Sequence, residues 1–263
     1  MELVKQGKIS CLQARWSTAG ALAGVTTRNG GISRPPYNSL NLGSNTDDAA
    51  YNVEGNRSVL ALEFGIPLHQ LLLVKQVHGS DVLVVNSENA DVSHFQDVEA
   101  DAIVSNQRGL MIGVTVADCY PVLLFDPQQQ VVAAVHVGWR GAAAGIIGKT
   151  LQVMEAEFSS RAADVLAAVG PGISARHYVV GKDVRDAFRA AGHDWNSIAE
   201  EQSLGKWQLD LKESCRLQLA AAGIKPGHCE ISEPCTYRHK ELFFSYRRDQ
   251  GKTGRQLGYV LLR

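Results

Sequence analysis

The hydrophobic residues follow two different periods, and the change of period divides the chain into strands and helices. Continuous apolar runs bounded by turn residues indicate buried strands, and an apolar residue every three or four positions indicates an amphipathic helix. Strands are expected on either side of Gly79-Ser80 within 71–85, at 101–105, 110–116, 120–125, 131–137 and 165–170, and as short segments near the C-terminus. Helices are expected at about 48–64, 142–158, 182–192 and 210–223.

Strands and helices are mixed along the chain without strict alternation. This order favours a mixed α/β layered fold over a regular doubly wound sheet. The glycine-, proline- and asparagine-rich stretch 26–43 indicates a long ordered loop, a kind of segment that often carries function. No internal repeat, low-complexity run or linker-like change of composition interrupts the sequence. We therefore expect a single domain over residues 1–263.

Composition narrows the class of protein. With 263 residues, 45% of them hydrophobic, the chain can bury a substantial core. Its formal net charge of -1 gives no general attraction to nucleic acid, so an anionic substrate must be held by local charges. No run of about 18 apolar residues and no secretory signal are present, which predicts no membrane partner and a cytoplasmic location.

The five cysteines are odd in number, widely spaced and without a CxxC pair. This pattern argues against a disulfide framework and a structural zinc knuckle, so reduced thiols are expected. Cys215 lies on the apolar face of the helix at 210–223, which Asp210 and Glu213 begin as a capping box. We interpret it as a core residue.

The segment 131–150, VVAAVHVGWRGAAAGIIGKT, ends like a nucleotide-binding phosphate loop. That motif requires G-x-x-x-x-G-K-[ST], which places its first glycine at position 143. Ala143 stands there, and Gly148-Lys149 falls about two turns into the predicted helix rather than at its start. The phosphate-loop interpretation is rejected, and the chemistry of this segment is expected near His136.

The polar link 126–130 indicates a hairpin between the strands on either side. If Asp126 pairs with Val131, position 136 falls opposite 121, and Cys119 lies two residues further on the same face. Together with His78, also at a strand end, they form a His-His-Cys set, which suits a catalytic zinc with a vacant fourth position. Cys119 could instead be a nucleophile with His136 as its base, or all three could be ordinary core and surface residues. Spacing alone favours the last interpretation, because scattered Cys and His rarely converge.

Several longer motifs carry a resemblance to a known family: TTRNGGISRPPYNSLNLG (26–43), KQVHGSDV (75–82), ADCYPVLLFDP (117–127), VAAVHVGWRGAAAGI (132–146), VGPGIS (169–174) and CTYRHKELFFSYRRDQGKTGRQLGYVLL (235–262). In this order they closely resemble the YfiH-like family. It is also called the laccase-domain or polyphenol oxidase family, and it includes bacterial purine nucleoside phosphorylases and the peptidoglycan editing factor. The resemblance implies a single-domain layered α/β/β/α sandwich, with His78, Cys119 and His136 as metal ligands.

The activity that the resemblance implies is phosphorolysis of purine nucleosides, namely adenosine, inosine, guanosine and methylthioadenosine, with adenosine deamination as a second reaction. One alternative is a peptidoglycan editing factor that hydrolyses L-Ser from a UDP-MurNAc precursor. Another is a Cys-His hydrolase, because the implied fold is similar to a toxin class that uses such a pair. A non-enzymatic, metal-stabilised binding module is a further option.

Zinc is the expected cofactor, and copper could occupy the same site because affinity for nitrogen and sulfur ligands rises toward copper. The older copper oxidase label is doubtful, since the chain has eight histidines and no His-x-His pair.

Phosphate is expected at Arg140, at the start of the helix after GWRG, and at Arg28 in the long loop. Asp118, beside Cys119, is expected to orient a ligand histidine or to act as a general base, although a turn or cap role explains it equally well.

Three positions depart from the family pattern: Lys75 replaces an acidic or neutral residue, Asn45 a histidine and Val179 a glutamate. If the missing groups help select the substrate, the preferred nucleoside differs from that of the family.

Overall fold

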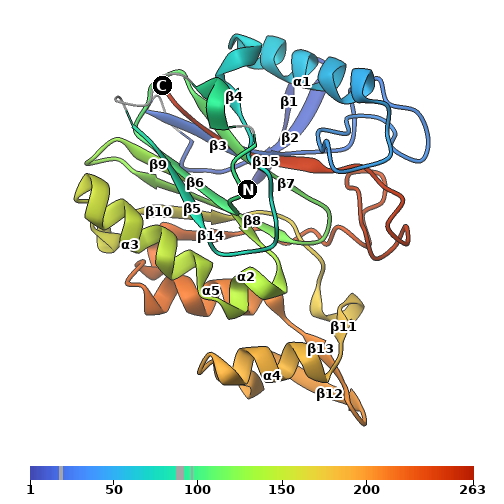
Figure 1. Ribbon diagram of the computed structural model, residues 1–263, viewed down its shortest axis with the longest axis vertical. Coiled ribbons are helices and arrows are strands. Elements are labelled where there is room, and N and C mark those ends of the chain that lie inside the picture. Colours follow the sequence, from blue (N-terminus) through green and yellow to red (C-terminus); the bar gives the residue numbers. More distant parts are fainter. Residues whose placement is uncertain (18–19, 87–91, 96) are drawn as a thin grey trace.

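The fold consists of two six-stranded sheets packed face to face, with helices on both outer faces (Figure 1). This computed structural model describes residues 1–17, 20–86, 92–95 and 97–263. The α/β/β/α sandwich expected from the sequence is confirmed. Within the described residues, no helix combines the length and apolar character needed to cross a membrane.

The first sheet has the strand order β1-β2-β3-β15-β7-β4. Its strands are β1 Glu2–Gln6, β2 Ile9–Gln13, β3 Ala21–Thr26, β15 Gln256–Leu262, β7 Met111–Val116 and β4 Leu71–Leu72. Helix α1, Ala50–Phe64, covers its outer face, where Leu60 packs with Met111 and Tyr259 in one buried cluster. The C-terminal strand thus lies in the middle of the sheet and joins the N-terminal hairpins to the rest.

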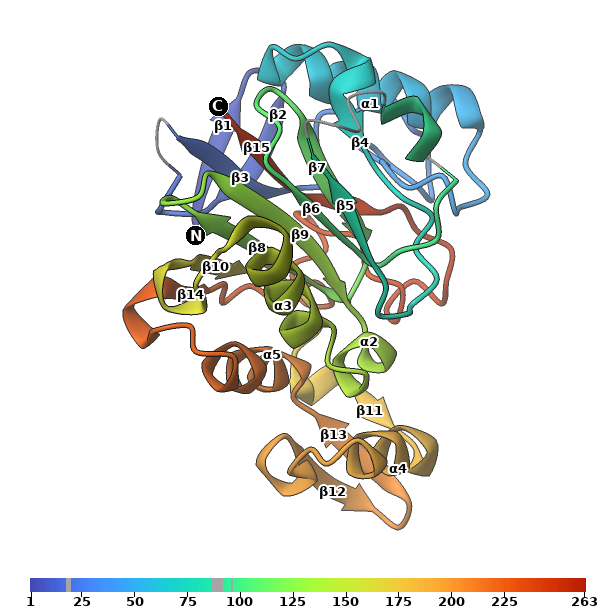
Figure 2. The same ribbon diagram turned by 60° about the vertical axis from the view of Figure 1, so that its left-hand side comes forward.

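The second sheet has the order β14-β10-β8-β9-β6-β5. Its strands are β14 Cys229–Ile231, β10 Leu166–Val169, β8 Tyr120–Asp126, β9 Val131–Val137, β6 Ala102–Ser105 and β5 Val82–Val85. Helices α2 Trp139–Ala143, α3 Ile146–Phe158 and α5 Leu211–Ala221 lie on its outer face (Figure 2). Strands β8 and β9 are buried throughout, because they lie in the middle of a sheet that is covered on both faces.

A small lobe projects from the helical side of the sandwich (Figures 1 and 2). It contains α4 Lys182–Ala190 and a three-stranded sheet of β11 Val179–Val180, β13 Lys206–Leu209 and β12 Ala199–Ser203. Trp195 lies 5.7 Å from Phe188 and 6.2 Å from Trp207 between ring centroids, and all three side chains are buried. These rings form the aromatic part of a buried cluster that continues onto the outer face of the second sheet.

Short 3-10 helices occur in several connections, at Leu68–Gln70, Val92–Phe95, Ala162–Asp164, Ala175–His177, Trp195–Ser197 and Pro226–His228.

Two predicted elements differ in the structure. The helix expected at 142–158 is two helices, because Gly145 adopts a left-handed backbone (φ 73°) that separates α2 from α3. The two strands expected within 71–85 are present but short, and they belong to opposite sheets: β4 to the first and β5 to the second. The segment between them therefore crosses the sandwich at its edge.

Other predictions are confirmed. Gly148-Lys149-Thr150 lies inside α3, as the rejection of a phosphate loop requires. Asp210 caps α5 by accepting a hydrogen bond from the Glu213 N–H, and Cys215 is fully buried as a free thiol. The long loop after β3 has neither helix nor strand as far as Ala49.

Candidate metal and active site

The β8–β9 hairpin brings Cys119 and His136 to the same end of the second sheet. Asp126 pairs with Val131 and Pro121 pairs with His136, which is the register that the sequence predicted. Cys119 immediately precedes β8, so its thiol meets the His136 ring at the open end of the hairpin. The register matters because a shift of one residue would place the two side chains on opposite faces.

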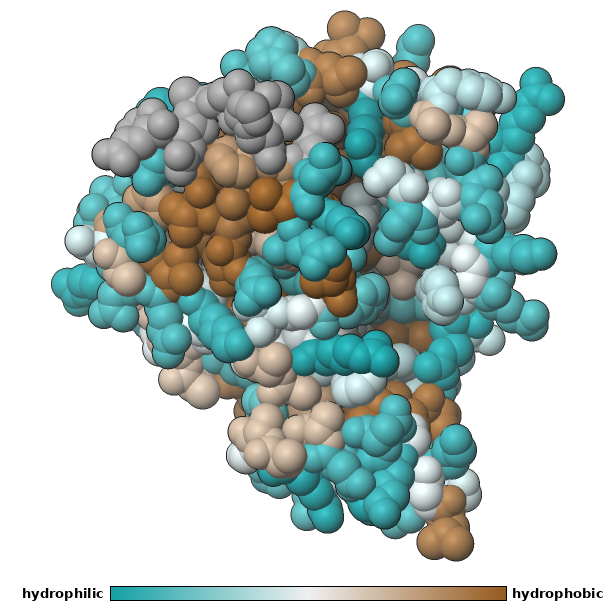
Figure 3. Space-filling model, in the orientation of Figure 1, coloured by the Kyte–Doolittle hydropathy of each residue, from teal (hydrophilic) through white to brown (hydrophobic). Residues whose placement is uncertain are grey.

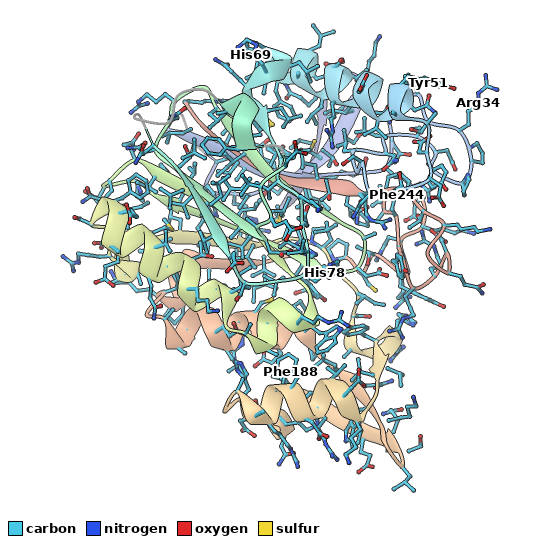
Figure 4. All side chains as sticks on the ribbon, viewed as in Figure 1. Arg34, Tyr51, His69, His78, Phe188 and Phe244 are labelled. Carbon is cyan, nitrogen blue, oxygen red and sulfur yellow. The ribbon has the colours of Figure 1, made fainter. Side chains whose placement is uncertain are left out.

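His78 completes the cluster from the crossing segment between β4 and β5. Its ring centroid lies 4.8 Å from that of His136, at 86° to it. One ligand atom each of His78, Cys119 and His136 can be chosen so that all three lie within 4.8 Å of one another. His136 is buried and His78 is exposed, so the cluster opens toward solvent on the His78 side, where the main body meets the lobe (Figure 4).

Asp101 fixes two of these residues at once. Its fully buried carboxylate lies 2.7 Å from Nδ1 of His136 and accepts backbone N–H bonds from Val77 at 3.2 Å, His78 at 3.1 Å and Gly79 at 2.6 Å. His78 has a left-handed backbone (φ 59°), a conformation that a non-glycine residue adopts only when its surroundings hold it. Asp101 supplies that support and leaves Nε2 of His136 free to face Cys119.

Sequence reasoning missed Asp101, although a signal was present. The residue stands directly before β6, and β6 pairs with β9 through Ala102 and Val135. Asp101 is therefore the residue across from His136, and its carbonyl accepts the His136 N–H at 2.7 Å. The signal is an acidic residue directly before a strand that neighbours the strand of a candidate metal ligand.

The electrostatics favour charge separation between the thiol and the imidazole. Burial raises the pKa of Cys119, but the adjacent His136 and His78 outweigh it and lower the pKa to about 6. Burial lowers the pKa of His136, but Cys119 and Asp101 outweigh it and raise the pKa to about 9. Burial likewise opposes ionisation of Asp101, yet the hydrogen bond from His136 holds its pKa below the ordinary value. A thiolate, which is the form that binds metals, is therefore available at neutral pH.

Gly138 forms the wall of the space between the three side chains. A Cβ at this position would lie 3.2 Å from Cys119 Sγ, 3.2 Å from His78 Cδ2 and 3.8 Å from His136 Cε1. The backbone thus approaches the cluster so closely that a Cβ here would require the neighbouring side chains to shift by a few tenths of an ångström. Two imidazoles and one thiolate around such a space form a donor set that fits a zinc or copper ion with one position open for a substrate.

Asp118 is bonded to the C-terminal segment, in agreement with the structural alternative considered for it. Its Oδ1 accepts a hydrogen bond from the Thr236 hydroxyl at 2.6 Å, and its Oδ2 accepts one from the Arg247 N–H at 2.7 Å. The histidine-orienting role predicted for Asp118 is filled by Asp101 instead. Asp118 joins the Cys119 loop to the C-terminal segment.

The two arginines expected to bind phosphate, Arg28 and Arg140, differ from each other in their surroundings. Arg28 donates to the carbonyls of Asn38 at 2.7 Å and Lys240 at 3.1 Å and lies 4.6 Å above the Phe244 ring, so its guanidinium joins two loops. Arg140 lies 4.4 Å above the ring of Trp139, and the described structure gives its guanidinium no hydrogen bond or ion pair.

The residues that depart from the family pattern lie outside the cluster. Lys75 forms an exposed ion pair with Glu99 at 2.8 Å. Asn45 and Lys75 both line a cavity of about 380 Å³ near Arg57. Val179 is on the exposed side of the lobe, where its carbonyl accepts from Arg247 at 3.1 Å.

The chain is similar to known proteins along most of its length. Residues 22–263 match the family described as multi-copper polyphenol oxidoreductase laccase. The chain belongs to this family. Among its curated relatives, the purine nucleoside phosphorylase YlmD of Geobacillus stearothermophilus is 36% identical over 248 residues, covering 92% of this chain and 90% of the relative. The purine nucleoside phosphorylase YfiH of Escherichia coli is 38% identical over 243 residues, covering 92% and 94%.

Solved structures of relatives share the whole fold. The Bacillus licheniformis protein YfiH superposes with a TM-score of 0.88 at 33% identity, over 92% of this chain and 93% of that one. YlmD of Geobacillus stearothermophilus superposes with a TM-score of 0.87 at 36% identity, over 93% of each chain. The resemblance inferred from the sequence motifs is confirmed.

Proposed function

We propose that this protein is a metal-dependent purine nucleoside phosphorylase that acts on adenosine, inosine, guanosine and methylthioadenosine. The observation that carries the proposal is the convergence of His78, Cys119 and His136 in a chain that is similar along most of its length to proteins named purine nucleoside phosphorylase.

The reaction requires two substrates at one site. A phosphate oxygen attacks C1′ of the nucleoside, the bond between C1′ and N9 breaks, and the bonding electron pair leaves with the purine, which takes up a proton. The products are the free base and the sugar 1-phosphate. The protein must therefore hold phosphate and nucleoside on opposite sides of C1′, and must place positive charge near the attacking phosphate.

His78, Cys119 and His136 would hold the metal, for which zinc is our proposal. When bound, such an ion supplies Lewis acidity that stabilises developing negative charge. The single His-Cys-His group found among the described residues fits one ion, whereas a multicopper oxidase needs several copper sites lined by many histidines. Asp101 keeps the His136 ring in the orientation that such an ion needs.

Deamination of adenosine is the second activity in the proposal. Water replaces phosphate as the attacking group, C6 of the purine replaces C1′ as the centre attacked, and the products are inosine and ammonia. Ammonia release from adenosine without phosphate measures this reaction separately from base release.

The proposal is tested by measuring metal content and base release together. Purified protein is expected to contain one zinc per chain and to release hypoxanthine from inosine only when phosphate is present. The Cys119→Ala variant should lose both the metal and the turnover. Metal-free protein with unchanged turnover would disprove the proposal.

The lowered pKa of Cys119 favours one alternative, a hydrolase in which Cys119 is the nucleophile and His136 the base. The two functions differ in their response to chelation. A cysteine hydrolase would remain active after removal of metal and would lose activity on alkylation of Cys119, whereas the phosphorylase should lose activity on chelation and recover it when zinc is restored.

A further inference from the structure

We propose that Arg140 and Arg247 form a clamp for inorganic phosphate on the open side of the His78-Cys119-His136 cluster. The inference rests on the proposed phosphorolytic function and adds the position of its second substrate. It keeps Arg140 of the sequence-based expectation and replaces Arg28 with Arg247.

The side chains of two other arginines in this region already donate hydrogen bonds to other groups of the protein. Arg28 donates to Asn38 and Lys240 and stacks on Phe244. Arg248 donates to both carboxylate oxygens of Asp249 at 2.8 and 2.9 Å and to three backbone carbonyls between 2.8 and 3.3 Å, those of Thr236, Tyr237 and Phe243. Binding phosphate through either would require several of these bonds to break.

Arg247 is held at the site by its backbone and keeps its side chain available. Its N–H donates to Asp118, the residue next to Cys119, at 2.7 Å. Its guanidinium lies 5.2 Å above the Tyr178 ring and uses Nη1 to donate to the Val179 carbonyl at 3.1 Å. Nε and Nη2 have no partner in the described structure. The side chain is thus oriented by the lobe and still has donors for an oxyanion.

Arg140 belongs to the main body and follows the strand that carries His136. It lies four residues after His136, at the second position of α2, and its exposed guanidinium stacks on Trp139 at 4.4 Å. A guanidinium fixed against an aromatic ring loses less conformational freedom when it binds an oxyanion than a free one does.

Tyr178 lies under the Arg247 guanidinium, and its pKa responds to the charges of both arginines and of Cys119. Burial and the Cys119 charge raise the pKa of Tyr178, while the charges of Arg247 and Arg140 oppose that rise. The phenol of Tyr178 is therefore within electrostatic reach of Cys119 and of both guanidinium groups. Figure 3 shows hydrophilic side chains among apolar ones where the lobe meets the main body, and Figure 4 places His78 at that junction.

The chemistry of this arrangement selects phosphate. Guanidinium groups bind phosphate oxygens through paired hydrogen bonds, and two of them can neutralise a dianion. Both oxygens of Asp118 already accept a hydrogen bond, Oδ1 from the Thr236 hydroxyl and Oδ2 from the Arg247 N–H. Phosphate held here would lie beside the metal cluster, where its attack on C1′ is required.

The test uses full-length, metal-replete protein and measures phosphate and nucleoside dependence separately. Arg247→Gln and Arg140→Gln are each expected to raise the KM for phosphate by about 10-fold or more while changing the KM for inosine less than about twofold. Arg247→Lys should recover only part of the loss, because an ammonium cannot make the paired contact. Arg189→Gln, an exposed arginine of α4 in the same lobe, is the matched control and should leave both constants unchanged.

Calorimetric binding of inorganic phosphate, without nucleoside, gives a readout that is independent of turnover. The affinity for inorganic phosphate should fall by the same factor in Arg247→Gln. A nucleoside 5′-monophosphate should bind the wild-type protein more weakly than inorganic phosphate does. If wild-type protein shows phosphorolysis but Arg247→Gln retains its KM and affinity for phosphate, the clamp is disproved and the proposed function stands. If the wild type releases base without phosphate, the proposed function itself fails.

Discussion

Asp101 is the residue that links the two histidines of the cluster. One buried carboxylate contacts the ring of His136 and three successive backbone N–H groups around His78. Because both histidines depend on the same group, we expect its loss to affect the geometry of both. Cys119, in contrast, depends on the register of its hairpin.

Asp101→Asn is expected to lower zinc affinity by about 10- to 100-fold, because an amide is a weaker acceptor for the His136 ring and offers one acceptor oxygen in place of two. Competition with a chromophoric chelator measures this. Asp118→Asn is the matched control, since Asp118 is also acidic and lies beside Cys119. Asp118→Asn should reduce the free energy of unfolding by about 1–3 kcal/mol and leave zinc affinity unchanged. Equal effects of both variants on zinc affinity would contradict the assignment.

The pKa values predict selective reactivity of Cys119 in metal-free protein. The thiolate fraction grows as the pH rises through the folded pKa of about 6, so alkylation by iodoacetamide should reach half its plateau rate near pH 6. His136→Asn removes the main group that lowers this pKa and should move the midpoint above 8. Cys11 and Cys215, whose pKa values burial raises, should stay unmodified. A wild-type midpoint near 9 would refute the thiolate.

At the level of elements, the sequence predicted the features that depend on residues close together in the chain. The β8–β9 register followed from a short polar link and continuous apolar runs, and so did the meeting of Cys119 with His136. The positions of Asp101 and Arg247 depend instead on contacts between distant segments: the pairing of β6 with β9, and the contact of the C-terminal segment with the Cys119 loop. The break between α2 and α3 lies at Gly145, whose left-handed backbone the spacing of apolar residues does not reveal.

The link between β9 and α2 is expected to limit the size of the metal site. Gly138→Ala is sterically permitted by the backbone (φ -84°), but the added methyl would lie 3.2 Å from Cys119 Sγ. Zinc affinity should therefore fall by about 10-fold or more, in line with other disturbances of ligand geometry.

Gly148→Ala is the control for Gly138→Ala. A methyl there meets no atom within 4 Å, and it replaces a glycine inside α3. It should increase the free energy of unfolding by about 0.5–1 kcal/mol without changing zinc affinity. Unaltered zinc binding in Gly138→Ala would show that the backbone does not confine the site.

At the scale of the whole molecule, a two-sheet body carries His78, Cys119 and His136, and a small lobe lies beside them. Two apolar clusters lie within the body, and a third runs from the outer face of the second sheet into the lobe. The lobe contributes Tyr178 and the Val179 carbonyl that orients Arg247. This division predicts that metal binding depends on the body and phosphate binding on both parts.

Phe188→Ala tests this division. Removal of this fully buried ring should destabilise the lobe by about 3–5 kcal/mol. Hydrogen exchange should accelerate in α4, β12 and β13 while β8 and β9 keep their protection. Zinc affinity should be retained and the KM for phosphate should rise. Loss of protection throughout β8 and β9 would show instead that the lobe and the body unfold as one unit.

The central claim is that the His78-Cys119-His136 metal site performs phosphorolysis. The most direct measurement is sugar 1-phosphate formation from inosine and phosphate by protein that has been chelated and then reloaded with zinc in steps. Product formation should be absent in the chelated protein and rise in proportion to bound zinc up to one ion per chain, and Cys119→Ala should remain inactive at every step. Full activity without metal, or base release that does not consume phosphate, would contradict the account.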